Sequence, residues 1–236
     1  MKIALLGYGK MGKEIEKIAL QRGHTIVLKA SKDHPFLSAD LKEVDVAIEF
    51  SEPKSAVDNI YKCFEANTPV VVGTTGWYNR FPEVRDECFN SENTLFYATN
   101  FSLGVNLFFK LNEVLAKMMT NIDSYEPSIN EIHHTEKRDS PSGTAITLVE
   151  AILDQLKRKS SWVNYDSDQE EEININSLRS PGVPGLHEVV YDSPNDQLSI
   201  KHEAKNRLGF ALGAVKAAEW VKNRKGVYTM SDMLDL

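Results

Sequence analysis

The residues best suited to chemistry stand close together in residues 131–144, a segment that we call the basic turn. Two histidines, a lysine and an arginine fall within six of its positions: His133, His134, Lys137 and Arg138. The chain of 236 residues is acidic as a whole, with 34 Asp and Glu against 27 Lys and Arg and a net charge of −7. Local positive charge draws an anionic ligand to itself. We therefore expect the basic turn to bind a small anion.

A metal ion is the alternative ligand for the basic turn, because four of its side chains are of metal-ligating types: Glu131, His133, His134 and Glu136. Adjacent histidines on a strand point to opposite faces, however. We also find no distant Cys or His pair with metal-ligand spacing. The sequence therefore predicts no metal.

The end of the basic turn has the pattern of a helix start. Ser140-Pro141 is typical of an N-cap followed by proline at the first helical position, and this role alone could explain the pair. A helix starting there leaves the N–H groups of Ser142, Gly143 and Thr144 free. Free N–H groups at a helix N-terminus bind anions, so we expect these residues to hold a substrate carboxylate.

A second motif stands at the start of the chain, where Gly7-Tyr8-Gly9-Lys10-Met11-Gly12 matches G-x-G-x-x-G. It lies between a predicted strand, residues 3–6, and a predicted helix, residues 10–21. In this context the motif indicates dinucleotide binding, with the pyrophosphate on the helix N-terminus. A glycine turn without a ligand is the alternative interpretation.

Two further segments could contact the same cofactor. Ser31 and Lys32 follow the second predicted strand, where NAD-selective sites usually have an acid, so NADPH is modestly favoured. Gly73-Thr74-Thr75-Gly76 follows an apolar run and would lie at the carboxyl edge of the sheet, where such folds bind ligands. A simple loop explains the second segment equally well.

The elements expected to position these residues divide the chain into two parts. In the first hundred residues short apolar runs alternate with amphipathic helices, which predicts a Rossmann-like α/β domain with a parallel sheet. Its predicted strands cover residues 3–6, 25–28, 44–50, 69–72 and 95–98, and its helices residues 10–21, 54–66 and 78–90. We assign residues 1–99 and 209–236 to this dinucleotide-binding domain.

Residues 100–208 form the second predicted domain, to which we assign substrate binding and oligomerisation. It has an α+β pattern with an open mixed sheet. The predicted helices cover residues 103–119 and 144–156, and the strands residues 125–134, 188–191 and 198–204. An acidic run from Asp166 to Glu172 is expected to be a solvated loop. The last long helix, Arg207 to Trp220, is expected to return to the first domain.

Composition excludes several classes of function. Hydrophobic residues make up 42% and charged residues 26% of the chain, which is typical of a soluble globular protein. No apolar run approaches the about 18 residues of a membrane span, and the N-terminus leaves no room for a signal peptide. The acidic charge argues against a nucleic-acid partner. Two cysteines suit a reducing compartment, so we expect a cytoplasmic protein.

One family has the same motifs in the same order. The run Glu131-Ile132-His133-His134…Lys137…Asp139-Ser140-Pro141-Ser142-Gly143-Thr144 resembles the signature of the 4-hydroxy-tetrahydrodipicolinate reductase (dihydrodipicolinate reductase) family. Further matches are Gly7 to Gly12, Gly73 to Gly76, Ala98 to Val105, Arg179…Gly182-Val183-Pro184-Gly185…His187 and Phe210-Ala211…Gly213-Ala214. They span nearly the whole chain.

The resemblance implies a cytoplasmic homotetramer that reduces a cyclic dicarboxylate in diaminopimelate and lysine biosynthesis, using NADPH or NADH. His133 would be the catalytic proton donor or acceptor and Lys137 a second proton donor. His134, Gly143 and Thr144 would bind substrate. The residues implied to line the cofactor are Gly7, Tyr8, Gly9, Lys10, Met11, Gly12, Gly73, Thr74, Thr75, Ala98, Thr99, Asn100 and Phe101.

The chain departs from the family pattern in three places. Lys10 replaces the usual arginine of the glycine loop, and Ser140 replaces a common alanine. Residues 31–44 are short and lack the usual acidic-basic pair after the second strand. The first and third departures bear on the choice between NADH and NADPH.

Two other functions remain open at this point. One is a different Rossmann-type dehydrogenase acting on a small dicarboxylate or amino acid, which would need a cysteine nucleophile or another acid–base set. Cys63 and Cys88 lie in helix-like sequence without a neighbouring histidine, which disfavours it. The other is a nucleotide sensor without catalysis, in which the basic turn would be idle.

Overall fold

The computed structural model describes residues 1–206 and 208–236, and it divides the chain into two compact units. The first comprises Met1–Leu103 and Leu208–Leu236, and the second Gly104–Arg207. The helix start predicted at residue 207 lies outside the described residues. Every helix among the described residues is too short or too polar to cross a lipid bilayer.

The first unit is built on a six-stranded sheet in the order β11-β5-β4-β3-β1-β2, in which every neighbouring pair is parallel. All four residues of β3 and all three of β4 are buried, as expected for a parallel sheet covered on both faces. The strands are β1 (Lys2–Leu6), β2 (Thr25–Ala30), β3 (Val46–Glu49), β4 (Val70–Val72), β5 (Thr94–Tyr97) and β11 (Gly226–Tyr228).

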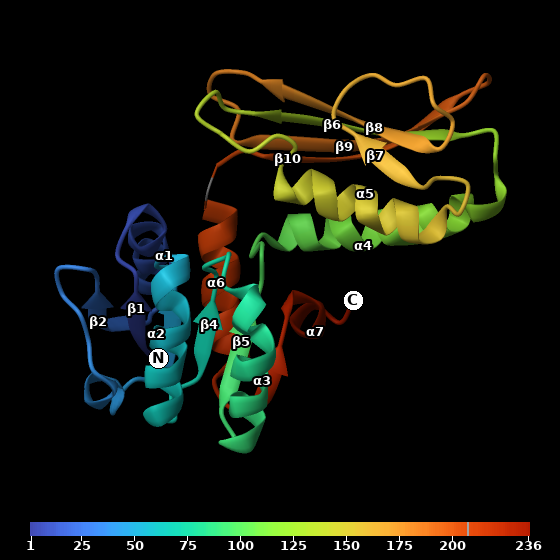
Figure 1. Ribbon diagram of the computed structural model, residues 1–236. Helices are drawn as coiled ribbons and strands as arrows, with labels where there is room; N and C mark the ends of the chain where they lie inside the picture. Colours follow the sequence, from blue (N-terminus) through green and yellow to red (C-terminus); the bar gives the residue numbers. More distant parts are fainter. Residues whose placement is uncertain (207) are drawn as a thin grey trace. The chain divides into compact units, whose positions relative to one another are not determined.

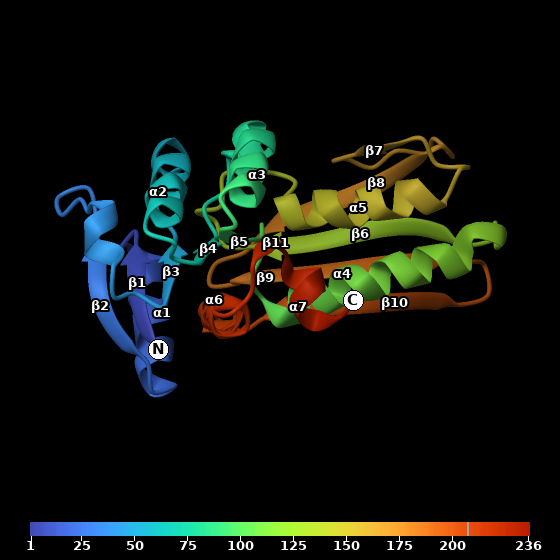
Figure 2. The same cartoon turned by 90° about the horizontal axis from the view of Figure 1, so that it is seen from below.

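Helices cover both faces of this sheet, as Figures 1 and 2 show. Alternate strand residues serve the two faces: Ala4 and Leu6 pack in the core under α2 and α3, while Ile3 and Leu5 pack with α1 and α6. The helices are α1 (Lys10–Gln21), α2 (Pro53–Glu65), α3 (Phe81–Asn90), α6 (Leu208–Val221) and α7 (Met230–Leu234).

The second unit has a five-stranded mixed sheet in the order β10-β9-β6-β8-β7. β9 is antiparallel to β6 and β10, whereas β8 is parallel to β6 and β7. Helices α4 and α5 lie on one face, where they bury Ile129, Ile175 and Val189 (Figure 1). The elements are α4 (Leu103–Met118), β6 (Glu126–His133), α5 (Gly143–Gln155), β7 (Ser161–Val163), β8 (Glu172–Arg179), β9 (Gly185–Asp192) and β10 (Gln197–Ala204).

The predicted fold class is confirmed, but three strands and one α-helix were missed. Strands β7 and β11 have three residues each and helix α7 has five, too few for a periodic pattern. Strand β8 is longer, and it begins at Glu172, the last residue of the acidic run predicted as a loop. Its alternation of isoleucine and asparagine is a strand signal, because Ile173 and Ile175 are buried while Asn174 and Asn176 are half-buried.

Candidate active site

The first unit has a cavity at the point where its strand order reverses. From β1 the chain continues to β2 on one side and then to β3 on the other, and open α/β sheets bind ligands beside such a switch. The cavity measures about 510 Å³. Its walls include Gly7 and Tyr8 after β1, Ser31 after β2 and Ser51 after β3. The predicted glycine loop and the predicted ribose segment therefore face one space.

The three glycines of the loop have different roles. Gly7 has φ +103°, and a Cβ there would lie 2.2 Å from the carbonyl oxygen of Phe50. A Cβ at Gly12 would lie 2.3 Å from the carbonyl oxygen of Gly7. At Gly9, which caps α1 without a side-chain hydrogen bond, a Cβ would meet nothing within 4 Å. Gly7 and Gly12 thus let the backbone pack closely, and Gly9 leaves room for a phosphate over the start of α1.

Positive charge near the second strand is already paired. Lys32, in the wall of the cavity, forms an ion pair with Glu52 at 2.7 Å. Lys29 forms one with Glu16 at 2.6 Å. Asp33 also lines the cavity. The acidic neighbours reduce the attraction that Lys32 could exert on a 2′-phosphate.

The segment after β4 is tied to the end of β3. The hydroxyl of Thr74 accepts a hydrogen bond from the Ser51 N–H at 2.8 Å, and Thr74 is buried. A Cβ at Gly73 would overlap the ring of Phe50 at 2.1 Å. Thr75 is exposed. Packing thus accounts for Gly73 and Thr74, and a cofactor role for this segment stays a prediction.

In the loop after β5, the side chain of Phe101 packs in the hydrophobic core. Phe101 is buried and packs against Phe50 and Phe96, with ring centroids 5.6 and 5.9 Å away. Its side chain therefore packs in the core, and a cofactor contact of Phe101 stays a prediction. Ala98, Thr99 and Asn100 precede it in the loop between β5 and α4.

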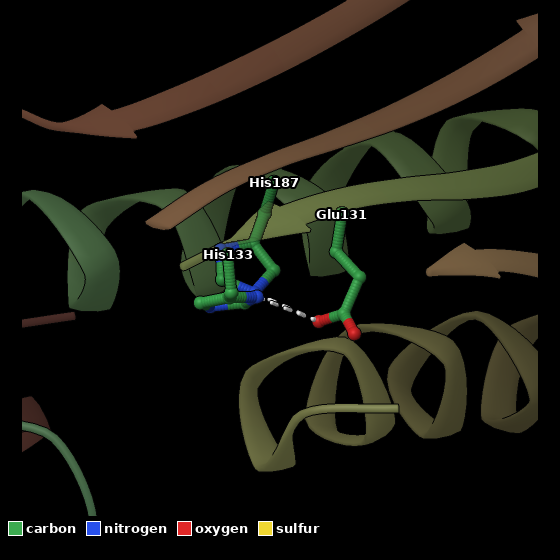
Figure 3. Close-up of side chains that lie close together, drawn as sticks. All are labelled: Glu131, His133 and His187. Atoms are coloured by element: carbon green, nitrogen blue, oxygen red, sulfur yellow. Dashed lines mark ion pairs between the residues drawn. The ribbon is translucent and has the colours of Figure 1, made fainter. Parts of the chain in front are cut away.

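In the second unit, strand register assembles the residues around the basic turn. Glu131 and His133 lie on the buried face of β6. Antiparallel pairing places His187 of β9 opposite Glu131, and parallel pairing places Arg179 of β8 beside His133. Figure 3 shows the rings of His133 and His187 next to the carboxylate. His187 and Arg179 entered the sequence analysis only as part of a family motif, because their positions depend on strand pairing over about fifty residues.

Glu131 is the centre of this group. Its carboxylate is fully buried, and Oε2 lies 3.5 Å from Nδ1 of His133 and 3.4 Å from Nε2 of His187. Nη1 of Arg179 lies 3.5 Å from Oε1. Burial alone would raise the pKa of Glu131, but hydrogen bonds from His187 and Ser142 outweigh burial and lower it to about 2. The carboxylate is therefore ionised at neutral pH.

His133 is neutral in the free protein. Burial and the neighbouring His187 lower its pKa to about 4, with Lys137 and Arg179 acting in the same direction against Glu131. The sequence-based argument used the fact that an unperturbed histidine titrates near physiological pH, and the surroundings of His133 move its pKa below that range. A neutral imidazole can accept a proton through one nitrogen and donate a hydrogen bond through the other.

Glu131, His133 and His187 are also of metal-ligating types, and their donor atoms lie within 4.8 Å of one another. The search for distant ligands in the sequence missed this approach of His187. Both carboxylate oxygens, however, accept the Ser142 N–H, at 3.1 and 3.2 Å. The guanidinium of Arg179 beside the same carboxylate opposes a cation. These contacts fit an internal hydrogen-bonded network better than a metal site, and we assign no metal.

The start of α5 differs from the prediction in two respects. The N-cap is Ser142 rather than Ser140, and the Ser140–Pro141 peptide bond is cis. Ser142 caps the helix because its hydroxyl accepts the Ala145 N–H at 3.2 Å and bonds Nε2 of His187 at 2.9 Å. Its own N–H is donated to Glu131, so the expected free N–H at Ser142 is wrong.

The next two amides remain available. Within residues 1–206 and 208–236, the N–H groups of Gly143 and Thr144 have no acceptor. A Cβ at Gly143 would meet nothing within 4 Å. The helix N-terminus thus presents two donors to open space, as an anion site requires. His134 follows β6 directly, and its buried Nδ1 has no partner among the described residues.

Lys137 is held by an acid that the sequence analysis did not use. Its ammonium forms an ion pair with Asp139 at 2.7 Å. The backbone carbonyl of Asp139 accepts a hydrogen bond from Nη2 of Arg179 at 2.6 Å. The segment that carries Lys137 is therefore tied to the end of β8.

The two cysteines do not offer a nucleophile. Cys63 lies in α2 and Cys88 in α3, and both are fully buried. Burial raises the pKa of Cys88 to about 11 and raises the pKa of Cys63 further still. This counts against a dehydrogenase that forms a thioester intermediate.

Comparison with known proteins gives concordant matches. The family model described as dihydrodipicolinate reductase, N-terminus, matches residues 1–101, and that described as dihydrodipicolinate reductase, C-terminus, matches residues 104–234. The 4-hydroxy-tetrahydrodipicolinate reductase of Christiangramia forsetii is 50% identical over 99% of this chain and 98% of its own length. That of Thermosipho africanus is 34% identical with the same coverage.

Among solved structures, dipicolinate-bound dihydrodipicolinate reductase from Paenisporosarcina sp. TG-14 has a TM-score of 0.79 at 21% identity and covers 97% of both chains. At this identity the match supports the fold.

Proposed function

Because the chain belongs to the dihydrodipicolinate reductase family, we propose that it reduces 4-hydroxy-tetrahydrodipicolinate to tetrahydrodipicolinate with NADH or NADPH. The observation that carries this proposal is the start of α5. Among the described residues, two amides there have no acceptor. They follow the segment that carries His133 and Lys137, which suits a carboxylate next to proton-transferring groups.

In this reaction the substrate gains a hydride and its hydroxyl group leaves as water, with net uptake of one proton. When bound, the reduced nicotinamide supplies the hydride. Gly143 and Thr144 hold a substrate carboxylate with their N–H groups, and His134 binds nearby. His133 transfers the proton, and Lys137 provides a positive charge and a second proton donor. The cofactor is contacted by the glycine loop, by two residues after β2 and by the segments after β4 and β5. These residues are Gly7, Tyr8, Gly9, Lys10, Met11, Gly12, Ser31, Lys32, residues 73–75 and residues 98–101, with Phe101 contributing its backbone.

The decisive test follows the absorbance of the reduced nicotinamide while the substrate is generated by coupled synthesis. We expect oxidation of the cofactor only when the substrate is present. Cofactor binding without oxidation would instead favour a nucleotide sensor, in which the basic turn has no catalytic role.

We also propose that the protein is a cytoplasmic homotetramer without a nucleic-acid or membrane partner. The second unit supports self-association, since α4 and α5 cover one face of its sheet and no helix among the described residues of that unit covers the other (Figure 1). A sheet face left uncovered within one chain is a common place for a second copy to bind.

Thr144 provides a test of carboxylate binding. We propose that the Thr144 hydroxyl adds a donor beside the two N–H groups. Thr144→Val removes this hydroxyl and should raise the KM for substrate about 10- to 100-fold, because a lost hydrogen bond to a charged group costs ~1.5–3 kcal/mol. Pyridine-2,6-dicarboxylate, a planar analogue, should compete with substrate and should inhibit the variant less. Thr147→Val is the matched control, since the Thr147 hydroxyl bonds the Gly143 carbonyl within the helix. An unchanged KM and unchanged inhibition in Thr144→Val would show that the Thr144 hydroxyl does not bind the carboxylate.

Lys32 provides a test of cofactor choice. We expect the wild-type protein to use both cofactors, with at most a modest advantage for NADPH, because Glu52 offsets the charge of Lys32. Lys32→Ala should lower kcat/KM for NADPH by up to about tenfold, the low end for a lost hydrogen bond to a charged group because Glu52 already pairs with Lys32, and leave NADH unaffected. Lys17→Ala, which breaks an exposed ion pair with Glu14 outside the cavity, is the control. Equal losses for both cofactors would show that Lys32 does not bind the 2′-phosphate.

A further inference from the structure

We propose that Glu131 is the positioning residue of the active site, holding His133, the start of α5 and the segment of Lys137 in fixed relation to one another. The inference rests on the proposed function, because the groups that it positions are those assigned to proton transfer and carboxylate binding. It adds a role for a buried side chain that does not itself need to touch substrate.

The first group held by Glu131 is the start of α5. Both carboxylate oxygens accept the N–H of Ser142, the residue that caps the helix. His187 supports the same cap from the other side, with Nε2 2.9 Å from the Ser142 hydroxyl and 3.4 Å from the Glu131 carboxylate. The amides of Gly143 and Thr144 follow directly in the chain. Their position relative to β6 is therefore set by Glu131 and His187.

The second group is the segment of Lys137. Arg179 connects it to Glu131, because Nη1 lies 3.5 Å from the buried carboxylate and Nη2 donates to the Asp139 carbonyl at 2.6 Å. Asp139 in turn holds the Lys137 ammonium at 2.7 Å. Without the carboxylate, the Arg179 side chain would lose the charge that orients its guanidinium plane.

The third group is the His133 imidazole. The groups that face it are Glu131 on its own strand, His187 on β9, Arg179 on β8 and Lys137 in the following segment, and of these four Glu131 alone is an acid. Its carboxylate lies 3.5 Å from Nδ1 of His133. A carboxylate attracts an N–H and repels a nitrogen lone pair, so it favours the tautomer with the proton on Nδ1.

That tautomer leaves the lone pair on Nε2, the nitrogen that can then exchange a proton with substrate. Nε2 lies beside Gly185, where a Cβ would approach it to 3.2 Å. A larger residue at position 185 would therefore press on the ring. Glycine leaves Nε2 the space that a reacting group needs.

A neutral amide cannot replace this carboxylate. Glutamine has the same size as glutamate, but its NH₂ group is a donor and would face the Ser142 N–H, the Arg179 guanidinium or Nδ1 of His133. At least one of these contacts must become a donor facing a donor. Glu131→Gln should therefore disturb the arrangement without creating a cavity.

The test compares Glu131→Gln with the control Glu188→Gln. Glu188 lies next to His187 on β9, but its carboxylate accepts a hydrogen bond from Asn130 and takes no part in the network around Glu131. Nitrogen chemical shifts of His133 in the free protein at pH 7 report its tautomer without any need for activity. We expect Nδ1–H in the wild type and the control, and a mixture or Nε2–H in Glu131→Gln.

Kinetics supply the second measurement. In Glu131→Gln, kcat should fall about 10- to 100-fold and the KM for substrate should rise, as for a misplaced catalytic group, while the KM for NADPH stays unchanged. A wild-type His133 with the proton on Nε2 would overturn the proposal even if Glu131→Gln fails to fold. So would a Glu131→Gln protein with the wild-type tautomer, kcat and KM. A wild-type protein that is inactive on the substrate would refute the proposed function, while the tautomer comparison would still test the role of Glu131.

Discussion

Replacing His133 by glutamine should lower kcat by about 10²- to 10⁴-fold, the usual contribution of a general acid–base group. Glutamine keeps hydrogen-bonding capacity at this position but cannot exchange a proton at neutral pH. NADPH binding should stay normal, because His133 lies in the second unit and the glycine loop in the first. Steady-state kinetics and a cofactor-binding titration measure the two effects.

His24→Gln is a suitable control, since His24 lies in the first unit and pairs with Glu219 at 2.7 Å. Wild-type kcat in His133→Gln, with an unchanged circular dichroism spectrum, would contradict the assignment. The basic turn would then be a surface that attracts the substrate and takes no part in proton transfer.

The pH dependence of the wild-type protein tests the same assignment, because the limb that reports His133 should shift in a definite direction when substrate binds. A pKa of His133 near 4 means that the free protein carries a neutral imidazole at pH 7. A bound dicarboxylate adds negative charge, which favours the imidazolium form and raises the pKa of His133. The limb of the kcat profile that reports His133 should therefore lie at higher pH than the corresponding limb of kcat/KM. His133→Gln should abolish both limbs.

The sequence was sufficient where local patterns determine structure. The helix predicted over residues 10–21 and the strands around the glycine loop follow from apolar periodicity and glycine placement, and α1 has those bounds. Strand β8 shows the opposite case, since its alternating residues follow an acidic run that was taken to be entirely loop. The alternation of isoleucine and asparagine that indicates this strand was present in the sequence, but the neighbouring acidic residues led to the prediction of a loop.

The interior of the site could not be predicted in the same way. Glu131 looked like one acid among several in the basic turn, and its role depends on His187 and Arg179, which arrive through the pairing of β6 with β9 and β8. The N-cap moved from Ser140 to Ser142 for the same reason, because the partners of Ser142 come from other strands. Such tertiary contacts override local propensity.

Lys137→Met should likewise lower kcat by about 10²- to 10⁴-fold, because it removes a proton donor and the positive charge next to the reacting group. It has a second effect that must be separated from the first. Without its ion pair, the Asp139 carboxylate stands unpaired in the basic turn and repels the dicarboxylate, so KM should also rise. Lys201→Met, which breaks an exposed ion pair with Glu203 on β10, is the control and should leave both parameters unchanged.

The double variant Lys137→Met/Asp139→Asn separates the two effects. Removing the unpaired Asp139 carboxylate should return KM close to its wild-type value. The kcat should stay low, since neither methionine nor asparagine can transfer a proton. Recovery of kcat as well would mean that Lys137 serves only to neutralise Asp139.

Combining Lys137→Met with His133→Gln tests whether the two side chains act together. If the two side chains act as one proton-transfer unit, the combined loss should be far smaller than the product of the single losses, because removal of either already disables the unit. Multiplicative losses would instead show that Lys137 and His133 act independently, at different points of the substrate.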